Sequence, residues 1–116
     1  FNAFPLPRRS GFRRSFQFAG EAMDRGFNVL IFPEGELTPD GTIRPFRAGI
    51  GILAAGLEAP VVPVKITGLW ELKSRGQRGY APAGAIKITI GSPLDLDPNA
   101  EPAAITRVVE SAVRTL

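Results

Sequence analysis

The segment Phe32-Pro33-Glu34-Gly35 has the residue types and spacing best suited to chemistry in this sequence. It directly follows an apolar run at 27–32 that is rich in β-branched and aromatic residues. Pro33 cannot donate to a strand ladder, and Gly35 lets the backbone turn or approach a ligand closely. Glu34 can accept hydrogen bonds from a hydroxyl-bearing substrate or from N–H groups of its own loop. The tetrapeptide alone leaves both roles open.

The 116 residues contain no histidine and no cysteine. Histidine is the usual general base near neutral pH and a common metal ligand, and cysteine supplies thiol nucleophiles and disulfides. Chemistry that depends on either residue is therefore excluded within these residues. We expect no metal site and no disulfide framework in this chain.

The charge balance favours an anionic partner. The chain has 14 Lys+Arg against 11 Asp+Glu, a net charge of +3. The excess lies in arginine, whose guanidinium group makes forked contacts with phosphate. Arg8, Arg9, Arg13 and Arg14 form a basic cluster that suits anionic lipid head groups or a solvated surface. We expect no nucleic-acid partner, because the chain lacks a stacking array or a recognition motif.

The pattern of apolar residues predicts the elements that position Glu34. We expect helices over 12–26, 50–57 and 102–116, strands over 1–6, 27–32, 61–67 and 85–90, and a long polar loop over 69–84. The resulting β-α-β-α-β-β-α order predicts an α/β fold, a largely parallel sheet with helices packed on it. Ligands of such sheets lie at the carboxyl ends of the strands, where the loop 33–47 begins.

Several short motifs occur in a fixed order along the chain: Asn2-Ala3-Phe4-Pro5-Leu6-Pro7-Arg8, Phe32-Pro33-Glu34-Gly35, Pro45-Phe46-Arg47-Ala48-Gly49 and Val62-Pro63-Val64. This ordered set resembles the phospholipid/glycerol acyltransferase family of the lysophosphatidate acyltransferase type. The resemblance covers essentially all of the chain and three of the family's four sequence blocks. It implies a fatty acyl transfer from acyl-CoA or acyl-carrier protein to a lysophospholipid or 1-acylglycerol-3-phosphate-like acceptor, in phospholipid biosynthesis, with no other cofactor.

The resemblance assigns roles to individual residues. Glu34 and Gly35 correspond to the acceptor-binding pair of the third block. Arg8 corresponds to the second-block arginine that faces the acceptor phosphate, with Arg9 as the alternative if the register differs by one. Pro63 corresponds to the fourth-block proline, although a proline in the strand 61–67 also suits an edge or a bulge.

The chain departs from the family pattern at two places. Leu37 stands where the family usually has an arginine, and Arg44 or Arg47 can supply that phosphate contact from the same loop. The first block, a histidine followed four residues later by aspartate, is also missing. We therefore expect residues 1–116 to form the C-terminal portion of one acyltransferase domain, inactive by itself. The parent enzyme would work at the cytoplasmic face of a membrane. The alternative is a non-catalytic module that binds anionic lipids or nucleotides.

Overall fold

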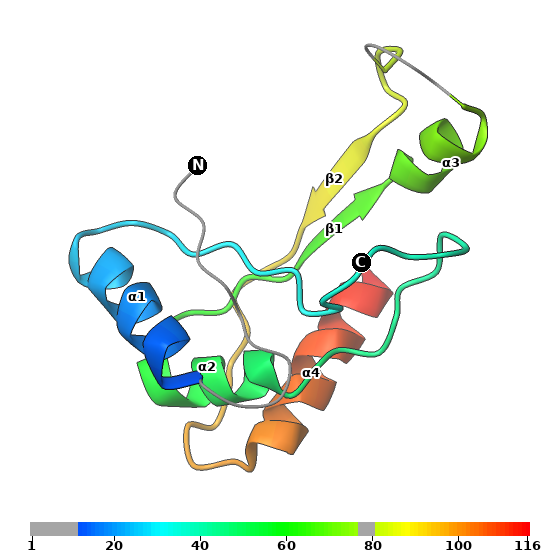
Figure 1. Ribbon diagram of the computed structural model, residues 1–116. Coiled ribbons are helices and arrows are strands. Elements are labelled where there is room, and N and C mark those ends of the chain that lie inside the picture. Colours follow the sequence, from blue (N-terminus) through cyan, green and yellow to red (C-terminus); the bar gives the residue numbers. More distant parts are fainter. Residues whose placement is uncertain (1–11, 77–80) are drawn as a thin grey trace.

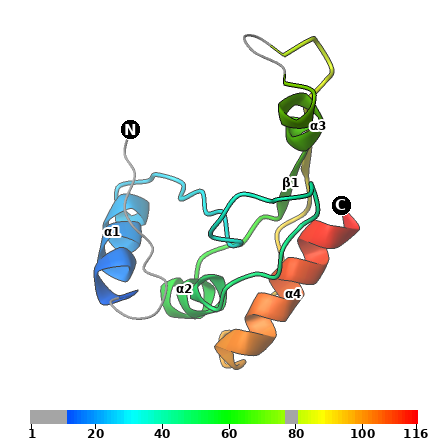
Figure 2. The ribbon, with the colours of Figure 1, turned by 45° about the vertical axis from the view of Figure 1, so that its right-hand side comes forward.

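The computed structural model describes residues 12–76 and 81–116, which form helices and a short β-ribbon (Figure 1). Three helices, α1, α2 and α4, lie together at one end, and the ribbon extends away from them with α3 near its far end (Figures 1 and 2). In chain order the elements are α1 (Phe12–Asp24), α2 (Gly49–Leu57), β1 (Val64–Thr67), α3 (Leu69–Ser74), β2 (Lys87–Ile90) and α4 (Pro102–Thr115). The fold is a mixed helix and strand fold, which confirms the predicted class only in this general sense.

The three predicted helices are confirmed with small differences at their ends. α1 stops at Asp24, and Gly26 follows in the left-handed region with φ 80°. The N–H of Gly26 donates to Met23 at 2.8 Å, and that of Phe27 donates to Ala22 at 2.9 Å. These bonds satisfy carbonyls that would otherwise be unpaired at the helix end. Pro102 begins α4, where its missing N–H costs no hydrogen bond.

The predicted largely parallel sheet is wrong. β1 and β2 form a two-stranded antiparallel sheet in which Val64 pairs with Ile90 and Thr67 with Lys87. Parallel neighbours need a crossover connection such as a helix packed on the sheet, and within residues 12–76 and 81–116 the only helix between β1 and β2 is the short α3. The ribbon is narrow, and Ile88 and Ile90 are exposed.

The predicted strand over 27–32 is also wrong. This segment has no regular secondary structure, and Phe27, Leu30 and Phe32 are 60%, 72% and 65% exposed. An extended segment becomes a strand only when a neighbour exchanges backbone hydrogen bonds with it. No strand lies beside it within residues 12–76 and 81–116. Its apolar composition therefore indicates a tendency toward strand structure without deciding the outcome.

The long polar loop predicted over 69–84 contains a short helix, α3, so that prediction is wrong for 69–74. Gly68 precedes α3 with φ 93°, a conformation that glycine adopts without steric cost. Leu69, Trp70 and Glu71 begin the helix, and the N–H of Leu72 donates to the carbonyl of Gly68 at 3.2 Å. Most of these residues have good helix propensity, which their position between two strands concealed.

Pro63 lies between an isolated bridge and the β-ladder, just before β1. Val61 forms an isolated bridge with Leu94, and the ladder resumes at Val64 opposite Ile90. Residues 62 and 63 therefore stand opposite residues 91 to 93, and the regular ladder is interrupted between the bridge and β1. Pro63 needs no N–H there, and its carbonyl accepts from Gly91 at 2.9 Å.

The core lies where α2 crosses α4. Ile50, Ile105 and Val109 are buried there. Gly51 is also buried at this crossing, where a side chain would meet the Pro102 carbonyl and the Thr106 hydroxyl. Partly buried apolar residues surround this centre: Ile31, Phe46, Ala54, Ala55, Val61, Leu94, Leu96 and Ala100. Ile31 and Phe46 attach the loop after residue 32 to the core at both of its ends.

Over residues 12–76 and 81–116, no helix combines the length and the apolar character that crossing a bilayer requires.

Candidate functional site

The segment 32–35 forms a tight turn. The N–H of Gly35 donates to the Phe32 carbonyl at 3.2 Å, and Gly35 has φ 71°, a conformation that costs other residues about 1–2 kcal/mol. The turn sends the chain away from the core and leaves Glu34 half-buried at its centre. The requirement for glycine here is conformational.

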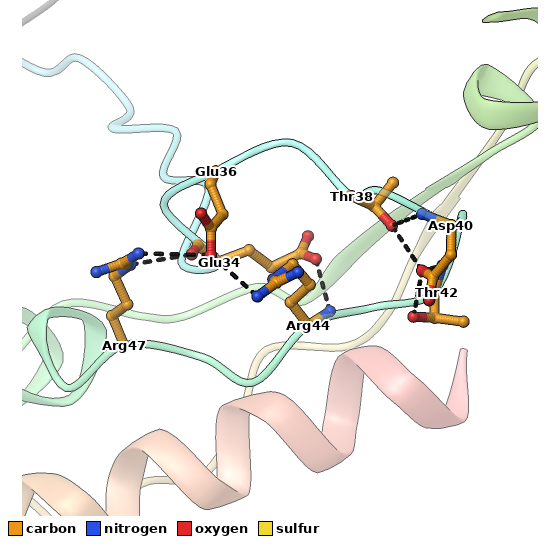
Figure 3. A network of polar contacts seen from close by, with 7 residues as sticks. All are labelled: Glu34, Glu36, Thr38, Asp40, Thr42, Arg44 and Arg47. Carbon is orange, nitrogen blue, oxygen red and sulfur yellow. Dashed lines mark hydrogen bonds and ion pairs between the residues drawn. The ribbon is translucent and has the colours of Figure 1, made fainter.

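The return segment 44–47 lies alongside this turn and is bonded to it (Figure 3). The N–H of Arg44 donates to Oε2 of Glu34 at 2.7 Å, and the N–H of Arg47 donates to the Pro33 carbonyl at 2.9 Å. Nε of Arg47 donates to the Glu34 carbonyl at 3.1 Å. Glu34 is therefore bonded at its side chain and at its backbone, and it closes the loop.

Gly35 also allows Arg47 to approach closely. A Cβ atom at position 35 would lie 2.7 Å from Cδ of Arg47 and closer still to its Nε. Carbon atoms normally stay about 3.5 Å or more apart. A larger residue at Gly35 would therefore displace the Arg47 side chain as well as strain the turn.

Two guanidinium groups meet on one carboxylate in this loop. Oε1 of Glu36 lies 3.2 Å from Nη2 of Arg44 and 3.7 Å from Nη2 of Arg47. Figure 3 shows Arg44 and Arg47 flanking this carboxylate, next to Glu34. The side chains are 39%, 39% and 42% exposed for Arg44, Arg47 and Glu36, so a ligand in solvent can reach them. The arrangement can bind an anion that has several oxygen atoms.

The tip of the loop, residues 38–42, is held by its own side chains (Figure 3). Oγ1 of Thr38 accepts from the N–H of Gly41 at 2.9 Å, and Oδ1 of Asp40 accepts from the Thr42 hydroxyl at 2.7 Å and from its N–H at 3.0 Å. The Thr42 hydroxyl bond, followed by the bond from its N–H, lowers the pKa of the Asp40 carboxyl. Trp70 of α3 packs on Gly41, where a Cβ atom would lie 2.6 Å from its ring.

Glu110 of α4 anchors the return segment to the core. Its Oε2 accepts from the N–H of Phe46 at 2.9 Å, and its Oε1 lies 2.8 Å from both Nε and Nη2 of Arg114. The Phe46 bond, and then Arg114, lowers the pKa of the Glu110 carboxyl below its usual value of 4.5. A residue 64 positions away in sequence therefore fixes the loop that carries Arg44 and Arg47.

This anchor predicts a pH dependence of stability. Because the folded-state pKa of Glu110 is lowered, its ionised carboxylate stabilises the fold at pH values above the usual pKa of 4.5. This contribution is lost as the pH falls through the folded-state pKa. Glu110→Gln should therefore lower the free energy of unfolding at pH 7, and its difference from the wild type should shrink as the pH falls below 4.5. Urea titrations at a series of pH values measure this difference. If the difference in free energy of unfolding between wild type and Glu110→Gln stayed constant down to about pH 3, the prediction would be wrong. Glu71→Gln, at an exposed position of α3, is the matched control.

The predicted site residues are partly brought together. Glu34, Gly35, Arg44 and Arg47 lie in one network, whereas Leu37 is 83% exposed and has an apolar side chain. Arg8 and Arg9 lie outside the described residues. Pro63 lies just before β1, in a different part of the fold.

Sequence reasoning missed two acidic residues of this network. Glu36 bridges the two arginines, and Glu110 holds the backbone of Phe46. Neither has a spacing that identifies its partner, because both contacts depend on how the loop folds back. No group of three or more potential metal-ligating side chains occurs in the described part of the chain, 12–76 and 81–116.

Comparison with known proteins places these residues in context. The sequence model of the Acyltransferase family matches residues 1–67, which include the Glu34 turn and both loop arginines. The chain is similar to 1-acyl-sn-glycerol-3-phosphate acyltransferase BAT2, chloroplastic, of Brassica napus, with 32% identity over 74 residues, 64% of the chain and 22% of that protein. It is also similar to 1-acyl-sn-glycerol-3-phosphate acyltransferase LPAT1, chloroplastic, of Arabidopsis thaliana. The identity is 30% over 74 residues, 64% of the chain and 21% of that protein.

A mouse relative, 1-acyl-sn-glycerol-3-phosphate acyltransferase alpha, is 24% identical over 81 residues, 70% of the chain and 28% of that protein. The aligned part of the chain thus spans between about a fifth and just over a quarter of the length of these curated relatives. No solved structure matches the chain. The family match covers more than half of the chain and contains the turn and arginines described above, so the chain belongs to the Acyltransferase family.

Proposed function

We propose that this chain is the acceptor-binding part of an acyltransferase that moves a fatty acyl group from acyl-CoA or acyl-carrier protein to a 1-acylglycerol-3-phosphate-like acceptor in phospholipid biosynthesis. Family membership and the names of the relatives in rapeseed, Arabidopsis and mouse support acyl transfer in glycerolipid synthesis. In this proposal the enzyme works at a membrane surface, on its cytoplasmic face, and takes its acceptor from there.

The observation that carries the proposal is the pairing of Arg44 and Arg47 beside Glu34. Two guanidinium groups within reach of one point suit a phosphate, since each can donate forked hydrogen bonds to its oxygens. Leu37 stands where the family usually has an arginine that contacts the phosphate. In this proposal Arg44 and Arg47 of the return segment make that contact instead. Arg8 is proposed as a further contact to the same phosphate.

Glu34 takes two roles in this proposal. Its Oε2 holds the N–H of Arg44 and so fixes the loop. Within residues 12–76 and 81–116 its other oxygen, Oε1, has no hydrogen bond, and it is free to accept one from a hydroxyl group of the acceptor glycerol. The loop-support and acceptor-binding roles that the sequence left open are thus compatible.

In the reaction, the acceptor hydroxyl oxygen attacks the thioester carbonyl carbon. An ester C–O bond forms, the C–S bond breaks, and the thiolate leaves with the electron pair of that bond. A general base takes the hydroxyl proton and returns it to the thiolate sulfur. These 116 residues contain no histidine, so we propose that the base is a histidine in sequence outside them.

The test is an acyl-transfer assay on the full-length protein that carries this chain, with acyl-CoA and 1-acylglycerol-3-phosphate. Arg44→Ala and Arg47→Ala should each raise the KM for this acceptor about tenfold or more, because each removes a charge-assisted bond worth about 1.5–3 kcal/mol. The KM for neutral 1-acylglycerol should change little. Arg107→Ala, an exposed arginine of α4, removes the same charge elsewhere and is the control.

Two results would contradict the proposal. If both arginine variants had the same KM for the acceptor as the wild type, the acceptor phosphate would not bind at this loop. Binding of the acceptor without any turnover, in a full-length protein with an intact fold, would instead favour the non-catalytic lipid-binding module.

A further inference from the structure

Glu36 occupies the point at which the two arginines converge. The same oxygen, Oε1, contacts Nη2 of Arg44 at 3.2 Å and Nη2 of Arg47 at 3.7 Å. The two guanidinium groups therefore point at one position, which a carboxylate fills at present. All three side chains are more than a third exposed, so this position is open to solvent.

The bond that Glu36 makes is weak enough to be replaced. Exposed ion pairs contribute about 0–1 kcal/mol each, because water screens the charges and the long side chains lose freedom. A phosphate monoester carries a charge of about −1.5 to −2 at pH 7 and three terminal oxygens. It can therefore bond both guanidinium groups at once through different oxygens, whereas Glu36 contacts both through Oε1 alone.

The charges of the loop point the same way. Arg44 and Arg47 carry two positive charges, and Glu34 and Glu36 carry two negative charges, so the network is neutral as it stands. Glu34 is committed to the N–H of Arg44 by its side chain and to Arg47 by its carbonyl. Only Glu36 can leave without opening the loop, and its departure gives the position a net positive charge.

We propose that Glu36 is an internal competitor for the phosphate of the acceptor, and thereby a specificity-determining residue. Its carboxylate holds Arg44 and Arg47 in place when no acceptor is bound, and the phosphate displaces it. This inference rests on the proposed function, because it assumes that these arginines bind the acceptor. It adds that acceptor affinity is set by a competition within the loop.

The test measures binding of two soluble probes, sn-glycerol 3-phosphate and glycerol, to the full-length protein by calorimetry. Glu36→Gln should bind glycerol 3-phosphate about three- to tenfold more tightly than the wild type, since the two weak ion pairs no longer compete. Glycerol binding should not change. The gain should shrink at high salt, which screens the exposed charges. Glu21→Gln on α1 changes the net charge equally but releases no arginine, because its partner is Gln17.

The outcomes separate the two proposals. Unchanged or weaker binding of glycerol 3-phosphate by Glu36→Gln, while Arg44→Ala and Arg47→Ala weaken it, would overturn the competitor role and leave the proposed function standing. Unchanged binding in both arginine variants would overturn both. Glu36→Ala, checked by its thermal melt, should show the same gain as Glu36→Gln. A gain in the glutamine variant alone would overturn competition, because the amide would then be making a new bond.

Discussion

Gly51→Ala should destabilise the protein by about 1–3 kcal/mol or more. Gly51 is buried in α2, and a Cβ atom there would run into the Pro102 carbonyl oxygen and the Thr106 hydroxyl of α4. Backbone cannot move aside as a flexible side chain can, so the two helices would have to separate. This crossing holds the core of Ile50, Ile105 and Val109, and its opening would expose all three.

Chemical denaturation of the wild type and the variant measures the effect. Gly20→Ala is the matched control, because Gly20 is also a helical glycine but a Cβ atom there would lie 3.7 Å from Leu57, an ordinary contact. Alanine should raise the stability of that helix by up to about 1 kcal/mol. If the free energy of unfolding falls in Gly51→Ala and rises in Gly20→Ala, the loss at Gly51 comes from the close approach of α2 and α4. A Gly51→Ala protein as stable as the wild type would show that the helices cross with more room.

Replacement of Glu34 should have the largest effect on acyl transfer among the loop residues. Glu34→Ala removes the bond from Oε2 to the N–H of Arg44 and the contact proposed for the acceptor hydroxyl. Each hydrogen bond to a charged group contributes about 1.5–3 kcal/mol, so kcat/KM should fall about a hundredfold or more. Glu34→Gln keeps an oxygen that can accept from Arg44, and it should lose only about tenfold.

The comparison of the two variants separates loop support from acceptor binding. Loop support alone predicts that glutamine restores nearly full activity, whereas both roles together predict the intermediate value. The assay uses the full-length protein with acyl-CoA and 1-acylglycerol-3-phosphate, and the same pair of substitutions at exposed Glu71 is the control. Wild-type activity in Glu34→Ala would exclude this carboxylate from the reaction altogether.

These experiments depend on a site that is only partly visible in the sequence. The motif residues Glu34 and Gly35 can be found from types and spacing, and the loop arginines Arg44 and Arg47 from the family resemblance, because all four lie within one short segment. Glu36 cannot be assigned a partner in this way. Its bond to both arginines arises only when residues 44–47 fold back along the turn, and the same holds for Glu110, which comes from α4.

The sequence by itself determined the helices α1, α2 and α4, but not the short helix α3. α1, α2 and α4 agree with the apolar spacing, and Gly26 and Pro102 mark their ends, because helical hydrogen bonds join residues only four positions apart. Tertiary structure alone decided the sheet. A segment such as 27–32 forms a strand only if another segment lies alongside it, and the direction of β1 and β2 also depends on their pairing. The apolar, β-branched sequence of a segment does not determine which segment pairs with it. Strand hydrogen bonds join residues far apart in the sequence, and the ion pairs of the loop depend on how residues 44–47 fold back, so only the folded chain could fix them.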